Sequence, residues 1–199
     1  MSDMKKIRNI IEKADYNSLF APKDFISFTS YDNAKVILNR LEKEGLIKRL
    51  IDGIFYKPRF SVEMNDYFAI SPYAFIDKIS SIYDWNICLY GESALNYLSL
   101  STQVPSQYVF ISDGPYREYD LEGIKVKFKH TNMKFLTLSF KTKTAIESIK
   151  FIGKDKLTIE DINQLKRELN NKEKEELYGY KKYAPVWMHK VLERITIND

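Results

Sequence analysis

Residues 31–58 constrain the fold more than any other part of the chain, because they combine a helical pattern, a glycine stop and a tight hairpin. They read YDNAKVILNRLEKEGLIKRLIDGIFYKP. Apolar residues recur at the i, i+3, i+4, i+7 spacing of one helix face, and these are Ala34, Ile37, Leu38 and Leu41. Asp32 or Asn33 is expected to cap this helix. Gly45 is expected to end it, since glycine tolerates positive φ.

The hairpin follows at once. Residues 46–50 and 54–58 are two short apolar and basic runs, and Asp52-Gly53 between them is a strong two-residue turn signal. We therefore expect two antiparallel strands directly after the helix.

Amides and cations on this helix and hairpin suit contacts with duplex DNA. Asparagine reads adenine and arginine reads guanine in a major groove, while basic strands can straddle phosphates. The residues predicted to contact DNA from the helix are Asn33, Lys35, Val36, Asn39, Arg40 and Lys43. Those predicted from the hairpin, acting as a wing, are Lys48, Arg49, Lys57 and Arg59. A charged helix face is often simply solvated by water, and this interpretation is an alternative to DNA binding.

Two further helices are expected before this segment. Residues 3–14 carry a helical apolar stripe, and residues 20–25 suggest a short helix with Pro22 in its first turn. The order helix, helix, helix, hairpin is that of a winged helix-turn-helix domain, which we place at residues 1–60.

Composition permits this interpretation without requiring it. The 199 residues are 44% hydrophobic and carry a net charge of +4, a mild excess that allows a polyanionic partner. Residues 1–58 hold 11 Lys and Arg against 8 Asp and Glu, so +3 of that charge lies there.

The single cysteine, Cys88, excludes an internal disulfide and is expected in the core. The charged N-terminus and the lack of a membrane-length apolar stretch indicate a cytoplasmic protein.

Residues 61–199 show a mixed α and β pattern, so the predicted fold class is α+β with a helical C-terminus. A connector is expected at 58–66. Predicted helices are 66–81 with an interruption near Pro72, 92–100, 143–152, a long helix opened by a Thr158/Asp161 capping pair, and a final one from Pro185. Predicted strands are 87–90, 108–112, 118–120, 124–129 and 135–140.

Two constellations in this second half might carry chemistry. Tyr90-Gly91-Glu92-Ser93 resembles a hydrolase nucleophile elbow but lacks its final glycine, and Ser93 has only His130 and His189 as possible bases.

The second constellation is acidic and would suit a metal-dependent nuclease. Asp113, Glu118 and Glu122 precede Lys125 and Lys127, but a hairpin with surface charges explains the same residues. The chain has no CxxC, paired-histidine, P-loop or GxGxxG motif. We therefore expect no catalytic residues, no metal and no cofactor.

Longer motifs resemble a known family. The N-terminal runs are FAPKDF at 20–25, LNRLEKEGLIKRL at 38–50 and GIFYKP at 53–58, and the later runs are GESALNYLSLSTQVP at 91–105 and FISDGP at 110–115. Over residues 15–150 the chain resembles AbiEi-type antitoxins of type IV, abortive-infection toxin–antitoxin systems. The resemblance implies a repressor that binds its own promoter. It also implies a neighbouring nucleotidyltransferase-like toxin, neutralised without a stable complex by a second domain at 61–199.

The predicted function is therefore a DNA-binding transcriptional autoregulator, the antitoxin of such a module. One alternative is a protein-interaction module that docks a partner with its winged helix. The other is a nuclease that uses the second domain.

Overall fold

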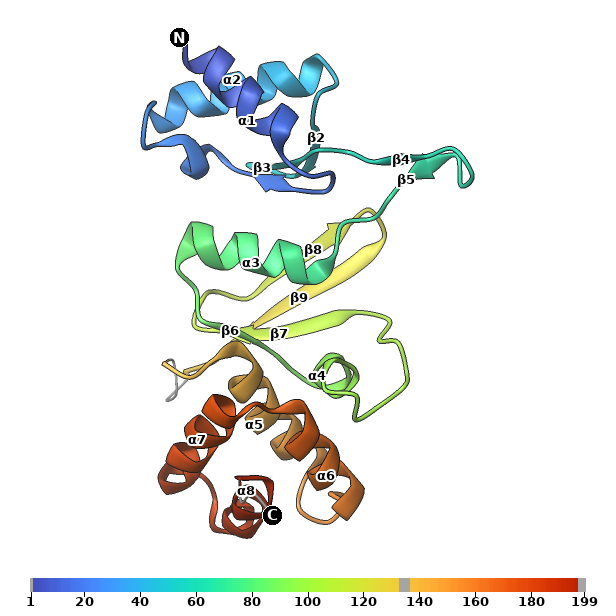
Figure 1. Ribbon diagram of the computed structural model, residues 1–199, viewed down its shortest axis with the longest axis vertical. Helices are drawn as coiled ribbons and strands as arrows, with labels where there is room; N and C mark the ends of the chain where they lie inside the picture. The colour runs from blue at the N-terminus through green and yellow to red at the C-terminus, as the bar shows by residue number, and fades with distance from the viewer. Residues whose placement is uncertain (1, 133–136, 197–199) are drawn as a thin grey trace. The chain divides into compact units, whose positions relative to one another are not determined.

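The computed structural model describes residues 2–132 and 137–196, and these form an α+β protein, as predicted (Figure 1). The chain divides into two compact units. One comprises Met1–Asp84 with Tyr119–Ile124, and the other comprises Trp85–Glu118 with Lys125–Asp199. This division lies elsewhere than the boundary expected at residue 60. Among the described residues, no helix is long and apolar enough to span a bilayer.

The first unit contains three α-helices, one 3-10 helix and five short strands in its main segment. In chain order these are α1 (Asp3–Lys13), β1 (Leu19–Phe20), η1 (Pro22–Phe25), α2 (Tyr31–Lys43), β2 (Lys48–Ile51), β3 (Ile54–Tyr56), β4 (Phe60–Ser61), β5 (Asp66–Tyr67) and α3 (Pro72–Tyr83). Strands β1, β3 and β2 form an antiparallel sheet in that order.

The predicted apolar stripe of α2 is the centre of this unit's core. All four of its residues are buried and pack with residues of α1, η1 and β3. The buried cluster consists of Ile7, Ile11, Phe20, Phe25, Ala34, Ile37, Leu38, Leu41, Ile47 and Phe55. The prediction of this helix and of the hairpin after it is therefore confirmed.

Two local predictions in this region were wrong. Ser30, rather than Asp32 or Asn33, caps α2, because Ser30 has the extended backbone of a cap and its hydroxyl accepts a hydrogen bond from the Asn33 N–H. Residues 20–25 do not form one helix. Phe20 pairs with Phe55 in the sheet, and only Pro22–Phe25 turn helically, as one 3-10 turn.

The expected connector at 58–66 is partly ordered, since β4 and β5 pair as a small hairpin in which Phe60 faces Tyr67. The helix predicted from residue 66 begins only at Pro72, which occupies its first turn. Proline suits that position because the missing N–H has no intrahelical partner there.

The second unit combines a sheet with a helical region. In chain order the elements from residue 85 on are β6 (Ile87–Leu89), α4 (Glu92–Tyr97), β7 (Tyr108–Ser112), β8 (Arg117–Leu121), β9 (Ile124–His130), α5 (Phe140–Ile152), α6 (Ile159–Glu168), α7 (Asn171–Tyr180), η2 (Lys181–Tyr183), η3 (Val186–Met188) and α8 (His189–Thr196). The strand order is β6-β7-β9-β8. Strand β7 runs antiparallel to β6 and parallel to β9. The division between the units passes through the β8–β9 hairpin.

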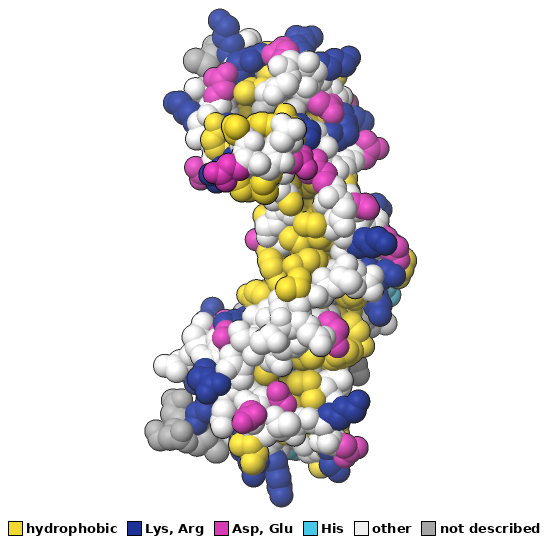
Figure 2. Space-filling model, turned by 90° about the vertical axis from the view of Figure 1, so that its right-hand side faces the viewer, with side chains coloured by type: hydrophobic (Ala, Val, Ile, Leu, Met, Phe, Trp, Pro, Cys, Tyr) yellow, Lys and Arg dark blue, Asp and Glu magenta, His cyan; other side chains and the backbone are white. Residues whose placement is uncertain are grey.

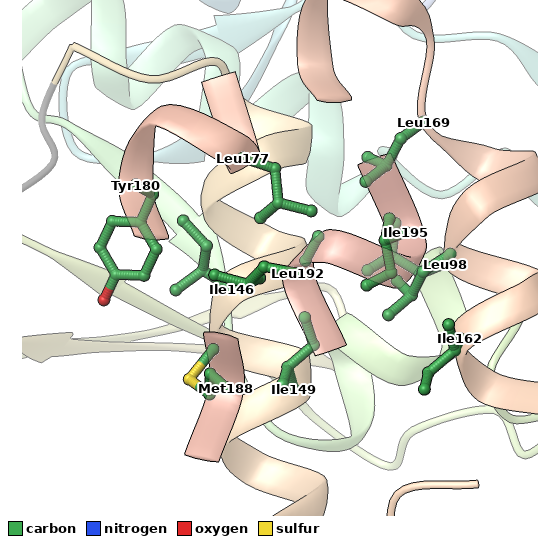
Figure 3. Close-up of a cluster of buried hydrophobic side chains, with 12 residues drawn as sticks. Leu98, Ile146, Ile149, Ile162, Leu169, Leu177, Tyr180, Met188, Leu192 and Ile195 are labelled. Carbon is green, nitrogen blue, oxygen red and sulfur yellow. The ribbon is translucent and has the colours of Figure 1, made fainter. Parts of the chain in front are cut away.

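Helix α5 is the centre of the helical region, and its residues 142–149 are all buried. Ala145, Ile146 and Ile149 pack against apolar residues of α6, α7, η3 and α8 (Figure 3). Such complete burial is expected of a helix that other elements surround.

The C-terminal helices differ from the prediction of one long helix after Thr158. The Thr158/Asp161 capping box is confirmed, but the helix ends at Glu168 because Leu169 adopts an extended backbone. Asn170 then caps α7 with a second capping box that includes Glu173.

The strand predicted at 135–140 is not present over its described part. Residues 135 and 136 lie outside the described residues. Residues 137–139 form a turn, and Ser139 caps α5, which begins at Phe140.

Replacing Ile149 with alanine tests the helical core. Ile149 is 0% exposed, so Ile149→Ala should lower the free energy of unfolding by about 2–5 kcal/mol, since it removes buried methyl groups and leaves a cavity. Urea unfolding followed by tryptophan fluorescence measures this, because Trp85 and Trp187 both lie in the second unit. The matched control is Ile159→Ala at a position 69% exposed, which should change stability by less than about 0.5 kcal/mol. Equal effects would contradict this assignment of the core.

Candidate nucleic-acid interface

The exposed face of α2 lies opposite its buried stripe. At about 100° per residue, Asp32, Val36 and Lys43 fall near the middle of this face, Lys35 and Arg40 lie toward its two edges, and Val36 is 56% exposed. Lys35, Arg40 and Lys43 are exposed, and none forms an ion pair with another described residue. Basic and acidic side chains are interspersed on the N-terminal unit, at the top of Figure 2. The exposed face of α2 thus carries three available cations, together with Asp32, on a surface of mixed charge.

The side chain of Asn33, which was also predicted to contact DNA, is already engaged in hydrogen bonds within the protein. Its side-chain amide donates hydrogen bonds to Thr29 Oγ1 at 2.8 Å and to Asp3 Oδ2 at 3.2 Å. The side chain therefore connects the start of α2 to the start of α1.

Arg49 joins the hairpin to α2. Its guanidinium donates to both carboxylate oxygens of Glu42, at 3.1 and 2.7 Å, and to Asn39 Oδ1 at 2.7 Å. It also approaches Asp52 at 3.4 Å and lies over the Phe55 ring. The hydrogen bond with Glu42 is the main reason that the pKa of Arg49 is raised. We call this set, Asn39, Glu42 and Arg49, the helix–hairpin clamp.

The other two basic residues of the hairpin also have intramolecular partners. Lys48 lies 4.0 Å from the centroid of the Tyr67 ring and 3.6 Å from Glu122 Oε1. Lys57 donates to the carbonyl oxygens of Glu12 and Ala14, at 2.7 and 2.8 Å, and so satisfies the C-terminal end of α1.

Arg59 is the remaining predicted residue. It is exposed, its guanidinium lies over the Phe68 ring at 4.6 Å, and it forms no ion pair with a described residue. The available cations are therefore Lys35, Arg40, Lys43 and Arg59, and the hairpin supplies fewer than the sequence suggested. The spacing of charges along the chain does not reveal Glu42 as the partner of Arg49, because their contact forms only when the hairpin folds back on the helix.

Ser93, in the motif that resembles a nucleophile elbow, has a structural role. It is 1% exposed, and its hydroxyl donates to the Gln107 carbonyl at 3.1 Å and accepts from the Val109 N–H at 3.0 Å. Both hydrogen bonds join α4 to the start of β7. The two possible bases contact backbone carbonyls instead, His130 that of Gly114 and His189 that of Ala184.

The acidic residues of the nuclease alternative also have partners. Asp113 accepts hydrogen bonds from the backbone N–H and the side-chain amide of Asn86, both at 2.9 Å. Glu118 pairs with Lys127 at 2.7 Å, and Glu122 accepts a hydrogen bond from the Tyr56 hydroxyl at 2.9 Å. No group of three or more His, Cys, Asp or Glu within the described chain could hold a metal ion.

Removing the clamp's cation should loosen the hairpin. Arg49→Met keeps an unbranched apolar stem but loses the ion pair, and partly exposed pairs of this kind contribute up to about 1 kcal/mol. Amides of residues 46–56 should then exchange roughly two- to fivefold faster in hydrogen-exchange mass spectrometry. Arg59→Met, which removes an arginine without a carboxylate partner, is the control. Unchanged protection in Arg49→Met would show that the clamp contributes nothing.

Cys88 should be unreactive in the folded protein. Burial is the main cause that raises the pKa of its thiol to about 12, and the nearby Glu147 adds to it. The pKa of the unfolded thiol is ~8.5, so the contribution of this thiol to stability is present below that pH and is lost as the pH rises toward the folded pKa. A disulfide reagent at pH 8 should label Cys88 only after urea is added. Rapid labelling of the native protein would contradict its burial, and Cys88→Ala controls for background.

Comparison with known proteins places the chain in a family. A family of unknown function (DUF6088) matches residues 6–177, and the chain belongs to it. A search of curated proteins gave no match.

Proposed function

We propose that this member of the DUF6088 family is a transcriptional regulator that binds duplex DNA by inserting α2 into the major groove. The observation that carries the proposal is the exposed face of α2, where Lys35, Arg40 and Lys43 have no carboxylate partners among the described residues. This face stands opposite a fully packed apolar stripe, so the helix cannot turn it inward without exposing the core.

The order of elements around α2 supports this proposal. Helix α1, strand β1, the 3-10 turn η1, helix α2 and the hairpin β2–β3 follow the order of a winged helix-turn-helix domain. The pairing of β1 with β3 completes the small sheet expected beside the recognition helix. In this interpretation η1 replaces the usual second helix and α2 is the recognition helix.

In this proposal, some residues of α2 contact bases and others contact phosphates. Arg40 can donate two hydrogen bonds to guanine, and Val36 can contact a thymine methyl group. Lys35 and Lys43 suit phosphates, which position the protein without reading sequence. Asn39 is a poorer reader of adenine, because its carbonyl oxygen already accepts a hydrogen bond from Arg49.

The hairpin would act mainly by shape in this proposal. Arg49 could reach a phosphate only by leaving Glu42, and Lys57 only by leaving the end of α1. Arg59 has no such partner among the described residues and is the best candidate for a backbone contact beside the helix.

We further propose that the regulator is an antitoxin that represses its own promoter. The support is the resemblance of residues 15–150 to AbiEi-type antitoxins, carried by runs such as GESALNYLSLSTQVP and FISDGP. Residues 61–199 would then neutralise a neighbouring toxin without a stable complex and without catalysis. The hydrogen bonds that engage Ser93 and Asp113 support a structural role for both.

One observation favours a second candidate, a protein-docking module. The β4–β5 hairpin exposes apolar side chains, among them Val62 and Met64 between its strands. Apolar groups on a protruding hairpin suit a protein partner better than DNA.

Substitutions on α2 test the proposal, with duplex DNA from the region upstream of the protein's own gene as the ligand. Arg40→Ala should weaken specific binding by about 1–3 kcal/mol and relax the preference at one base pair. Lys43→Ala should weaken binding to all sequences alike and make the slope of log K against log salt shallower by about 0.9. Fluorescence anisotropy at several salt concentrations measures both effects.

The control is Lys156→Ala, an exposed lysine of the second unit, which should leave affinity unchanged. Wild-type affinity in both α2 variants would overturn the proposal. Retained DNA binding without repression or rescue from the toxin would leave the DNA interface standing and overturn the antitoxin role.

A further inference from the structure

Strand β9 presents a row of three lysines on one face of the second unit's sheet. Val126 and Phe128 are buried on one face of the strand. The alternating residues Lys125, Lys127 and Lys129 point to the opposite face of the sheet. Because a strand rises ~3.3 Å per residue, these side chains leave the backbone at intervals of about 6.6 Å. The row therefore offers regularly spaced positive charge along one line.

Two of the three lysines are available to an external anion. Lys127 is paired with Glu118 at 2.7 Å. Lys125 and Lys129 are exposed and form no ion pair with a described residue. The ammonium group of Lys129 lies 5.2 Å from the centroid of the Tyr90 ring. Both residues line a cavity beside the lysine row.

The cavity measures about 440 Å³, within the range of small-ligand pockets. Its apolar wall includes Tyr90, Phe151, Val104 and Pro105, and Lys129 of the row also lines it. The Tyr90 and Phe151 rings meet edge to face with centroids 5.7 Å apart. An aromatic wall of this kind suits a planar group.

The charges around the cavity separate two kinds of ligand group. Glu92 also lines it, and its carboxylate disfavours a phosphate inside while it can accept hydrogen bonds from the exocyclic amine of a base. Phosphates are favoured outside, along Lys125 and Lys129.

We propose that the second unit binds single-stranded nucleic acid, with the phosphates along β9 and one unstacked base in the cavity beside Tyr90 and Phe151. A cationic track combined with aromatic platforms is the usual design of such sites. A duplex fits less well, because its bases are stacked and cannot enter a cavity. An acidic peptide would match the lysines but would leave the aromatic wall unused. This site is separate from the α2 face and does not depend on the function proposed for it.

The test uses the full-length protein and a fluorescent single-stranded dodecamer rich in cytosine. Lys125→Gln combined with Lys129→Gln should weaken binding roughly tenfold at low salt. It should also make the slope of log K against log salt shallower by about 1.4, since each lost phosphate contact accounts for about 0.7. Lys154→Gln combined with Lys156→Gln removes the same charge from exposed positions elsewhere in this unit and should have no effect on the slope.

A second variant tests the cavity. Phe151→Leu retains apolar contact with Tyr90 and Gly91 but removes the ring, and it should weaken binding roughly fivefold at every salt concentration. Circular dichroism and urea unfolding establish that each variant is folded.

Three results would overturn the proposal. One is an unchanged salt slope in the double lysine variant. Another is equal competition by a glutamate oligomer of the same charge, which would assign the lysines to an acidic protein partner. The third is loss of single-strand binding in Arg40→Ala combined with Lys43→Ala, which would place the signal on α2.

Discussion

Burial of the apolar stripe of α2 is the constraint on which the rest of the N-terminal unit depends. Ala34, Leu38 and Leu41 are fully buried, together with apolar residues of α1, η1 and β3. Because these contacts determine the rotation of the helix, they also determine that Val36, Arg40 and Lys43 face solvent. The clamp of Arg49 on Glu42 and Asn39 then holds the hairpin beside the same helix. The proposed recognition surface is thus a consequence of the core.

Sequence alone could predict the features that depend on neighbouring residues. The stripe of α2, the Asp52-Gly53 turn and the Thr158/Asp161 capping box all follow from short spacings, and the structure has each of them. Errors arose where several nearby residues suit one role, as when Ser30 rather than Asp32 or Asn33 became the cap of α2.

Partners that are distant in sequence could not be predicted in this way. Lys57 binds carbonyl oxygens of α1, and Arg49 binds a carboxylate on the preceding helix, so cations that seemed free in the sequence have structural roles. The same limit applies to the second unit. The alternation of apolar residues and lysines along β9 can be recognised in the sequence. The cavity beside Tyr90 cannot, because it requires α5 to bring Phe151 against the end of β6.

We propose above all that the exposed face of α2 binds duplex DNA. The most direct measurement is a titration of ¹⁵N-labelled full-length protein with duplex from its own upstream region, followed by backbone amide shifts. We predict the largest changes at Lys35, Val36, Arg40 and Lys43, with smaller changes near Arg59. Changes confined to residues 85–118 and 125–196, with those of α2 unaffected, would contradict it.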